Sequence, residues 1–200
     1  IPIALSNGAG VTDGVFFLNY NADLLTITGG VVNAALTGAT FSVKTSGPGS
    51  SAQATITFHS ATPLAAGAVR LGGLSAITPV NAAYKSKVLL HFSSLSLNGG
   101  SIAATNDDGV QVVGFFGETS GDGVYTSLDA NLLSRVAATL DTGFDIYPVA
   151  DPVLIGAING NGLIQASDDT LLNFYMSGTP AGPPGPALPG VRDNVARRPR

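Results

Sequence analysis

The sequence predicts a mainly β protein, in which a β-sandwich is followed by a small α-helical unit. Three observations predict this fold class. Up to position 113, short apolar segments alternate with turns rich in Gly, Asn, Ser and Asp, as in a sandwich of short strands. Beyond that position the charge balance changes, and a pattern of Gly, Asp and Leu recurs after 39 residues.

The individual strands are expected where apolar and polar residues alternate. The clearest case is 52–59, in which Ala52, Ala54, Ile56 and Phe58 alternate with polar side chains. A period of two places one face of a strand on a core and the other in water. Further strands are expected over 1–5, 15–20, 25–28, 40–44, 68–71, 87–92 and 110–113.

The composition excludes several classes of protein. Of the 200 residues 11% are charged, and the formal net charge is −4, which argues against a basic nucleic-acid binder and a coiled coil. Without cysteine, disulfides and thiolate chemistry are excluded, a composition that fits exported bacterial or archaeal proteins. Apolar runs are shorter than the ~20 residues that span a bilayer. We expect a soluble extracellular or cell-surface protein and, because Ile1 lacks a preceding leader, a segment of a longer product.

Charge counting locates the domain boundary. Residues 1–113 carry four basic and four acidic side chains, whereas residues 114–178 carry eight acidic side chains and one basic side chain, Arg135. Residues 179–200 carry four arginines and one aspartate. We therefore expect a sandwich over 1–113, an acidic helical unit over 114–178, and a Pro/Gly-rich extended linker with a basic tail over 179–200.

The acidic segment is internally repeated. Gly121-Asp122-Gly123 recurs as Gly160-Asn161-Gly162, and Asp129 recurs as Asp168, each at an offset of 39 residues. A Leu-Leu pair follows in both copies. Each copy is therefore expected to be a glycine-rich loop followed by a helix.

The first loop has the spacing of an EF-hand-type calcium loop, with oxygen ligands at positions 1, 3, 5, 7, 9 and 12 and glycine at position 6. Gly123 falls at position 6. The candidate ligands, with position 7 acting through its carbonyl, are Glu118, Ser120, Asp122, Val124, Thr126 and Asp129. Three carboxylates with hydroxyls between them suit Ca²⁺. An isolated match is usually an ordinary turn, but duplication with a helix attached favours a metal loop.

The second loop is poorer in carboxylates. Ala157 occupies its first position. The remaining candidate ligands are Asn159, Asn161, Leu163, Gln165 and Asp168. Because each lost carboxylate lowers the affinity for a divalent cation, two possibilities stay open: a poorly occupied calcium site, or a metal-free loop held by turn hydrogen bonds.

These motifs resemble two known families. Residues 117–178, with Glu118-Thr-Ser-Gly-Asp-Gly and Ile158-Asn-Gly-Asn-Gly, resemble a dockerin, a paired calcium-loop module that plugs into cohesins. The segments Ile1-Pro-Ile-Ala-Leu and Gly14-Val-Phe-Phe-Leu-Asn-Tyr are similar to the opening strands of a cohesin domain. The resemblance implies a jelly-roll sandwich followed by two EF-hand-like loop–helix repeats. Cohesins have one more strand ahead of the segment that 1–5 resembles, so we expect that strand either to have been cut away or to be supplied by another chain.

The chain departs from the dockerin pattern in four places. Glu118 and Ala157 stand where dockerins prefer Asp, and Ser120 stands where they prefer Asn. An insert of about fifteen residues over 141–155 separates the repeats. These departures weaken the expectation of full calcium dependence, above all in the second loop.

The resemblance implies assembly and not catalysis. Calcium-dependent cohesin–dockerin contact would join the chain to a protein partner or to copies of itself, and a non-closing head-to-tail contact would give filaments. Dockerins contact cohesins through loop positions 10 and 11, which are expected to precede each helix and face outward. Here these partner-binding residues are Ser127, Leu128, Ala166 and Ser167.

Other functions are less favoured. A viral or phage fibre protein shares the Gly-rich, cysteine-free β composition and would form a trimer. A carbohydrate-binding module usually presents a row of aromatic rings, whereas here Trp is absent and the Tyr residues are scattered. For an enzyme, His59 and His91 are expected to be surface or paired side chains, and Asp107-Asp108-Gly109 predicts a hairpin turn.

Overall fold

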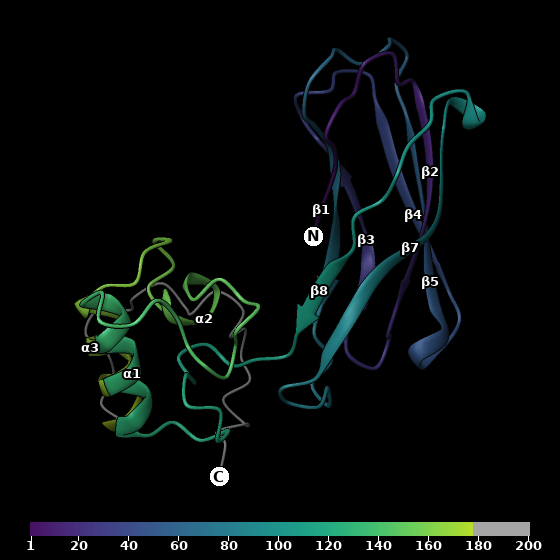
Figure 1. Ribbon diagram of the computed structural model, residues 1–200. Coiled ribbons are helices and arrows are strands. Elements are labelled where there is room, and N and C mark those ends of the chain that lie inside the picture. Colours follow the sequence, from purple (N-terminus) through teal and green to yellow (C-terminus); the bar gives the residue numbers. More distant parts are fainter. Residues whose placement is uncertain (178–200) are drawn as a thin grey trace. The chain divides into compact units, whose positions relative to one another are not determined.

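The computed structural model describes residues 1–177, so the linker and tail expected over 179–200 lie outside the described residues. The chain divides into two compact units, the first covering Ile1–Val113 and the second beginning at Gly114. The division falls where the charge balance of the sequence changes. The first unit is built from strands and the second from loops and helices (Figure 1).

Within the described residues, eight strands form two antiparallel sheets in the first unit (Figure 1). The strands are β1 (Pro2–Leu5), β2 (Asp13–Tyr20), β3 (Thr26–Val32), β4 (Thr40–Ser46), β5 (Ala52–His59), β6 (Val69–Ile77), β7 (Lys87–Leu97) and β8 (Gly109–Val112). The smaller sheet has the order β1-β6-β3, and the larger sheet has the order β4-β5-β2-β7-β8. The predicted mainly β class is confirmed.

The core lies between the two sheets. Phe41 and Ile56 from the larger sheet and Leu71 from the smaller sheet belong to one buried cluster. The alternation predicted for 52–59 is confirmed, because its four apolar side chains are at most 2% exposed. Full burial of an aliphatic side chain such as Ile56 stabilises the fold by about 1.5–3 kcal/mol.

Strands β6 and β7 extend beyond the ends that the sequence pattern predicts. In β7, Ser93 is an extra residue, because the adjacent β2 residues Phe17 and Leu18 pair with Ser94 and Phe92 respectively. A bulge of this kind shifts the alternation by one residue. A prediction from a strict period of two therefore ends the strand at this point, although the hydrogen-bonded pairing with β2 continues.

The hairpin turn predicted at Asp107-Asp108-Gly109 is wrong. Strand β7 ends at Leu97 and β8 begins at Gly109, so residues 98–108 form a long connection. Asp108 folds back onto β7, where it accepts a hydrogen bond from the backbone N–H of Phe92 at 3.3 Å. The polar residues thus mark the end of a loop and not a two-residue turn.

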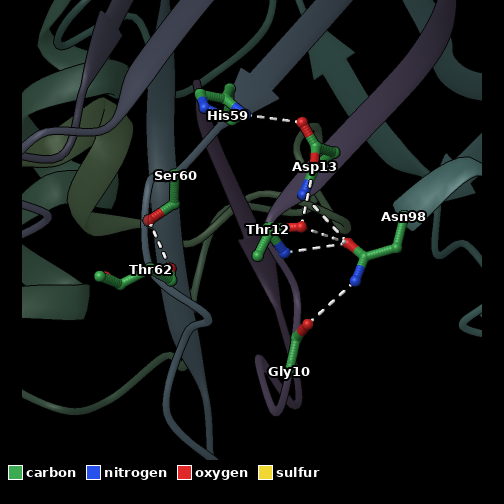
Figure 2. Close-up of polar contacts among 7 residues, drawn as sticks. All are labelled: Gly10, Thr12, Asp13, His59, Ser60, Thr62 and Asn98. Carbon is green, nitrogen blue, oxygen red and sulfur yellow. Dashed lines mark hydrogen bonds and ion pairs between the residues drawn. The ribbon is translucent and has the colours of Figure 1, made fainter.

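Asn98 ties the start of this connection to the segment before β2 (Figure 2). Its Oδ1 accepts hydrogen bonds from the backbone N–H groups of Thr12 at 2.9 Å and Asp13 at 3.0 Å, and its Nδ2 donates to the Gly10 carbonyl at 2.9 Å. Its backbone φ is 48°, a left-handed conformation that Asn tolerates better than most residues. One side chain therefore fixes two loops.

We expect Asn98→Ala to lower the free energy of unfolding of the first unit by about 2 kcal/mol, because two backbone N–H groups lose their acceptor. Asn98→Asp keeps that acceptor and loses only the hydrogen bond to Gly10, so its effect should be smaller. Urea unfolding followed by circular dichroism measures both variants. Equal losses in the two variants would contradict the role assigned to Oδ1.

The second unit contains two loop–helix repeats. Helix α1 (Ser127–Ala137) follows the first loop and α3 (Ala166–Ser177) follows the second, while the short α2 (Val153–Gly156) precedes the second loop. Helices α1 and α3 lie side by side (Figure 1), and the second Leu of each Leu-Leu pair, Leu133 and Leu172, is buried. Among residues 1–177, no helix has the length and apolar character needed to cross a membrane.

Candidate metal centre

Glu118 is the buried centre of the first loop, with no exposed surface. Its Oε1 accepts hydrogen bonds from the backbone N–H groups of Gly121 at 2.7 Å, Asp122 at 3.0 Å and Gly123 at 3.3 Å. Gly121 and Gly123 have φ values of 84° and 82°, which favour glycine. The glycines of the motif therefore bend the loop around the first carboxylate.

Asp129 joins the loop to α1. Its Oδ1 accepts hydrogen bonds from the backbone N–H groups of Thr119 and Ser120, both at 2.8 Å, and its Oδ2 accepts one from Thr126 N–H at 2.8 Å. Asp129 and Thr126 together form a capping box at the start of the helix. Such a box satisfies backbone N–H groups that the first helical turn leaves free. The loop and the helix are therefore one cooperative element.

The three carboxylates predicted for the first loop come together. One oxygen each from Glu118, Asp122 and Asp129 can be chosen so that all lie within 4.8 Å of one another. Glu118 and Asp129 are fully buried, whereas Asp122 is exposed. This arrangement leaves the cluster open to solvent on the Asp122 side.

None of the three carboxylates forms an ion pair with a basic side chain of the described residues. Arg135 is the single basic residue between positions 114 and 177, and it forms an ion pair with Asp141, with Nε and Nη2 at 2.6 and 2.9 Å from the two carboxylate oxygens. Buried carboxylates that lack a counter-charge are costly. Carboxylate and hydroxyl oxygens are the ligands that Ca²⁺ prefers, so the donor set of the first loop fits that ion.

The neutral candidate ligands of the first loop differ in how they are used. The Ser120 hydroxyl donates to Glu118 Oε1 at 3.0 Å, beside the carboxylate cluster. Thr126 is the N-cap of α1, and its hydroxyl both accepts from Leu128 N–H at 3.3 Å and donates to Asp129 Oδ2 at 3.1 Å. Val124 N–H donates to Asp122 Oδ1 at 2.8 Å. Thr126 is therefore engaged in starting the helix.

The second loop keeps the frame of the first with fewer charges. Asp168 is fully buried, and it accepts from the backbone N–H groups of Asn159 and Gln165, each at 2.9 Å. The amides also bond to other side chains: Asn161 Nδ2 donates to Gln165 Oε1, and Asn159 Nδ2 donates to Ser167 Oγ, both at 3.0 Å. Leu163 N–H donates to Asn161 Oδ1.

Tyr147 is a buried neighbour of the site that the sequence pattern does not identify. It is 2% exposed, and its hydroxyl donates to Glu118 Oε2 at 3.3 Å. Burial and, secondarily, the charge of Glu118 raise the pKa of Tyr147 well above its ordinary value, so the hydroxyl is a neutral donor. The residue lies in the segment between the repeats, outside the loop spacing, and a tyrosine there carries no local signal of a long-range contact.

The four residues predicted to bind a partner are all exposed, but their place in the chain differs from the prediction. Ser127 and Leu128 are the first residues of α1, and Ala166 and Ser167 are the first residues of α3. The expectation that they precede the helices is wrong, because the helices already begin at Ser127 and Ala166, and the N-cap of α1 is Thr126. Leu128 is 53% exposed.

The two histidines are surface side chains, as predicted, and each pairs with an aspartate that the sequence pattern does not identify. His59 Nδ1 lies 2.7 Å from Asp13 Oδ1 (Figure 2), and His91 Nδ1 lies 2.8 Å from Asp108 Oδ2. The hydrogen bond from each histidine lowers the pKa of its aspartate. The Ser60 hydroxyl donates to the Thr62 carbonyl, so it is not directed to His59.

No protein-family model matches the sequence, and no curated protein matches it significantly. Among solved structures, the chain is similar to a non-cellulosomal cohesin from the hyperthermophilic archaeon Archaeoglobus fulgidus, with 13% identity and a TM-score of 0.46 over 56% of this chain and 77% of that chain. It is similar to a chain of the CaDoc0917–CaCohA2 complex, with 21% identity and a TM-score of 0.44 over 56% of this chain and 86% of that chain. It is also similar to a cohesin module of a family 33 glycoside hydrolase from Clostridium perfringens, with 11% identity and a TM-score of 0.38 over 52% of this chain and 73% of that chain.

Proposed function

We propose that the protein is an assembly component that works by calcium-dependent protein–protein contact, with a cohesin-like sandwich over 1–113 and a dockerin-like unit from 114. The observation that carries the proposal is the cluster of Glu118, Asp122 and Asp129, two of them fully buried. None of these three forms an ion pair with a basic residue in the described part of the chain. We place its action outside the cell or at the cell surface, as the cysteine-free composition suggests.

Calcium would be held by the carboxylates of Glu118, Asp122 and Asp129, with the Ser120 hydroxyl and the Val124 carbonyl as neutral candidates. A bound cation supplies the positive charge that the buried carboxylates lack. Because Asp129 also belongs to the capping box of α1, the ion would stabilise the start of that helix. Calcium would therefore control the geometry of the helix start where Leu128 is exposed.

The contact surface proposed on the helical unit is formed by the first turns of α1 and α3, defined by Ser127, Leu128, Ala166 and Ser167. These side chains are small or apolar, uncharged and exposed. Covering a half-exposed leucine such as Leu128 in an interface is favourable, at roughly 25 cal/mol per Å² of apolar surface removed from water. An uncharged surface of this kind fits a partner face that also carries little charge.

The outer face of the larger sheet is the proposed receiving surface on a second copy. Val15 and Phe17 in β2 are paired with Thr57 and Thr55 in β5. Their alternation with the buried residues of both strands puts all four on the side opposite the core. The exposed apolar side chain of Leu128 on one copy would pack against this apolar and hydroxyl-rich face on a second copy. Head-to-tail association of copies is therefore the version we favour.

The test is the calcium dependence of assembly. Light scattering in calcium is expected to show assemblies of the full chain that dissociate in a chelator. Leu128→Asp should abolish them, because burying an unpaired carboxylate at the contact costs several kcal/mol. The matched control is Leu140→Asp, a leucine that is 69% exposed and lies beyond the other end of α1.

Three outcomes would contradict the proposal. Assemblies that persist in Leu128→Asp would exclude the helix starts as the contact. Equal loss in Leu140→Asp would indicate a general effect of charge. A stable trimer of the same size with and without calcium would favour the fibre-protein alternative.

A further inference from the structure

The segment between the two repeats packs directly onto the first metal loop. Ile146 occupies the space beside Gly121: a Cβ at that glycine would lie 2.4 Å from Ile146 Cγ1 and 2.9 Å from its Cδ1. The next residue, Tyr147, is 2% exposed and donates its hydroxyl hydrogen bond to Glu118 Oε2. We call residues 141–150 the brace.

The brace is fastened at its start and folded at its centre. Asp141 is held at the end of α1 by the two-pronged ion pair with Arg135. The backbone N–H of Tyr147 donates to the Phe144 carbonyl at 2.8 Å, and Ala150 N–H donates to the Tyr147 carbonyl at 3.0 Å. Tyr147 therefore lies in a hydrogen-bonded turn, and this turn restricts the backbone that carries its side chain towards Glu118.

The two carboxylate oxygens of Glu118 have different surroundings. Oε1 is surrounded by the Ser120 hydroxyl and by N–H groups of the loop. Oε2 receives the Tyr147 hydroxyl at 3.3 Å. Among the described residues this is the one hydrogen bond to Oε2. An oxygen with one hydrogen bond keeps a further lone pair, so Oε2 is the oxygen better able to bind a cation.

We propose that Tyr147 is a positioning residue for the calcium loop: its hydroxyl fixes the orientation of the Glu118 carboxylate, and the brace thereby couples calcium binding to the segment between the repeats. The inference rests on the proposed calcium site and extends it to a residue outside the loop spacing. Removing a residue that orients a metal ligand through a hydrogen bond typically lowers the metal affinity 10–100-fold.

The experiment is calcium titration of the full chain by calorimetry, with Tyr147→Phe compared with Tyr125→Phe. Tyr125 is a matched control because its hydroxyl donates to a backbone carbonyl, that of Phe116 at 2.8 Å, and not to a ligand carboxylate. Tyr147→Phe is expected to bind calcium about tenfold more weakly than the parent, whereas Tyr125→Phe should bind as the parent does. The melting temperature in chelator checks that both variants fold.

A second readout is amide hydrogen exchange in the brace. Calcium is expected to slow amide hydrogen exchange at residues 144–150 in the parent protein, and this protection should be reduced in Tyr147→Phe.

The results distinguish a failure of the role assigned to Tyr147 from a failure of the proposed calcium site. If the parent binds calcium and Tyr147→Phe binds it equally well, or if both phenylalanine variants weaken equally, the positioning role is overturned while the calcium site stands. Unchanged exchange at 144–150 on adding calcium to the parent would overturn the coupling to the brace. A parent that binds no calcium would overturn the site and this inference together.

Discussion

Glu118→Gln is expected to abolish the stabilisation that calcium gives the second unit, while leaving the calcium-free protein at least as stable as the parent. The substitution keeps an oxygen that can accept the N–H groups of Gly121, Asp122 and Gly123. It removes one buried negative charge from a cluster that contains Asp122 and Asp129. Repulsion between like charges falls, and so does the attraction for a cation.

The expected size follows from linkage. At a free calcium concentration roughly 100 times the Kd, binding to the folded form alone adds about 2.7 kcal/mol to the free energy of unfolding. Differential scanning calorimetry with calcium and with chelator measures this increment for the parent and for Glu118→Gln. The increment should be present in the parent and absent in the variant.

The matched control is Asp151→Asn, which removes one charge from an exposed side chain of the same unit, outside both the cluster and the brace, and keeps an oxygen that can accept the Val153 N–H. It should retain the calcium increment. An increment that survives in Glu118→Gln would show that the first position of the loop is not a ligand. An increment lost equally in Asp151→Asn would show that calcium responds to the net charge of the unit and not to a site.

Local pattern was sufficient to locate the eight strands, although not all of their ends, and to place a loop before a helix at 118–126. The alternation in 52–59 depends only on residues that are neighbours in the chain, and so does the spacing from Glu118 to Asp129. Strand order is different, because alternation shows which side of a strand faces the core but not which strand lies beside it. The pairing of β1 with β6, across most of the first unit, could not be read from either segment.

The errors have physical causes of the same kind. The Ser93 bulge breaks the period of two without breaking the strand, so the sequence pattern stops too early. Asp108 is of a residue type common in turns, but its carboxylate accepts a hydrogen bond from the backbone N–H of Phe92, 16 residues earlier in the chain. Tyr147 reaches Glu118 across 29 residues, and neither residue type nor spacing announces such a contact. Long-range hydrogen bonds were therefore the part that required the structure.

Ala157→Glu is expected to convert the second loop into a second calcium site. The two loops share their frame: Gly160 and Gly162 have φ values of 74° and 78°, like their counterparts in the first loop, and Asp168 accepts the N–H groups of Asn159 and Gln165. The side chain at the first position differs most, because Ala157 stands where the first loop has Glu118.

The carboxylate introduced by Ala157→Glu determines how the stability of the second unit should change, both without metal and with calcium. Position 157 is 5% exposed, so without metal the new carboxylate would lie buried beside Asp168 and should destabilise the unit by several kcal/mol. Calcium should reverse that loss, and the calorimetric stoichiometry should rise from one ion towards two.

Ala157→Gln has the same shape without the charge, so it should stay near one ion and respond to calcium as the parent does. A folded Ala157→Glu variant that still binds one ion would mean that the Asn161–Gln165 and Asn159–Ser167 hydrogen bonds hold the loop in a shape that a carboxylate alone cannot turn into a site.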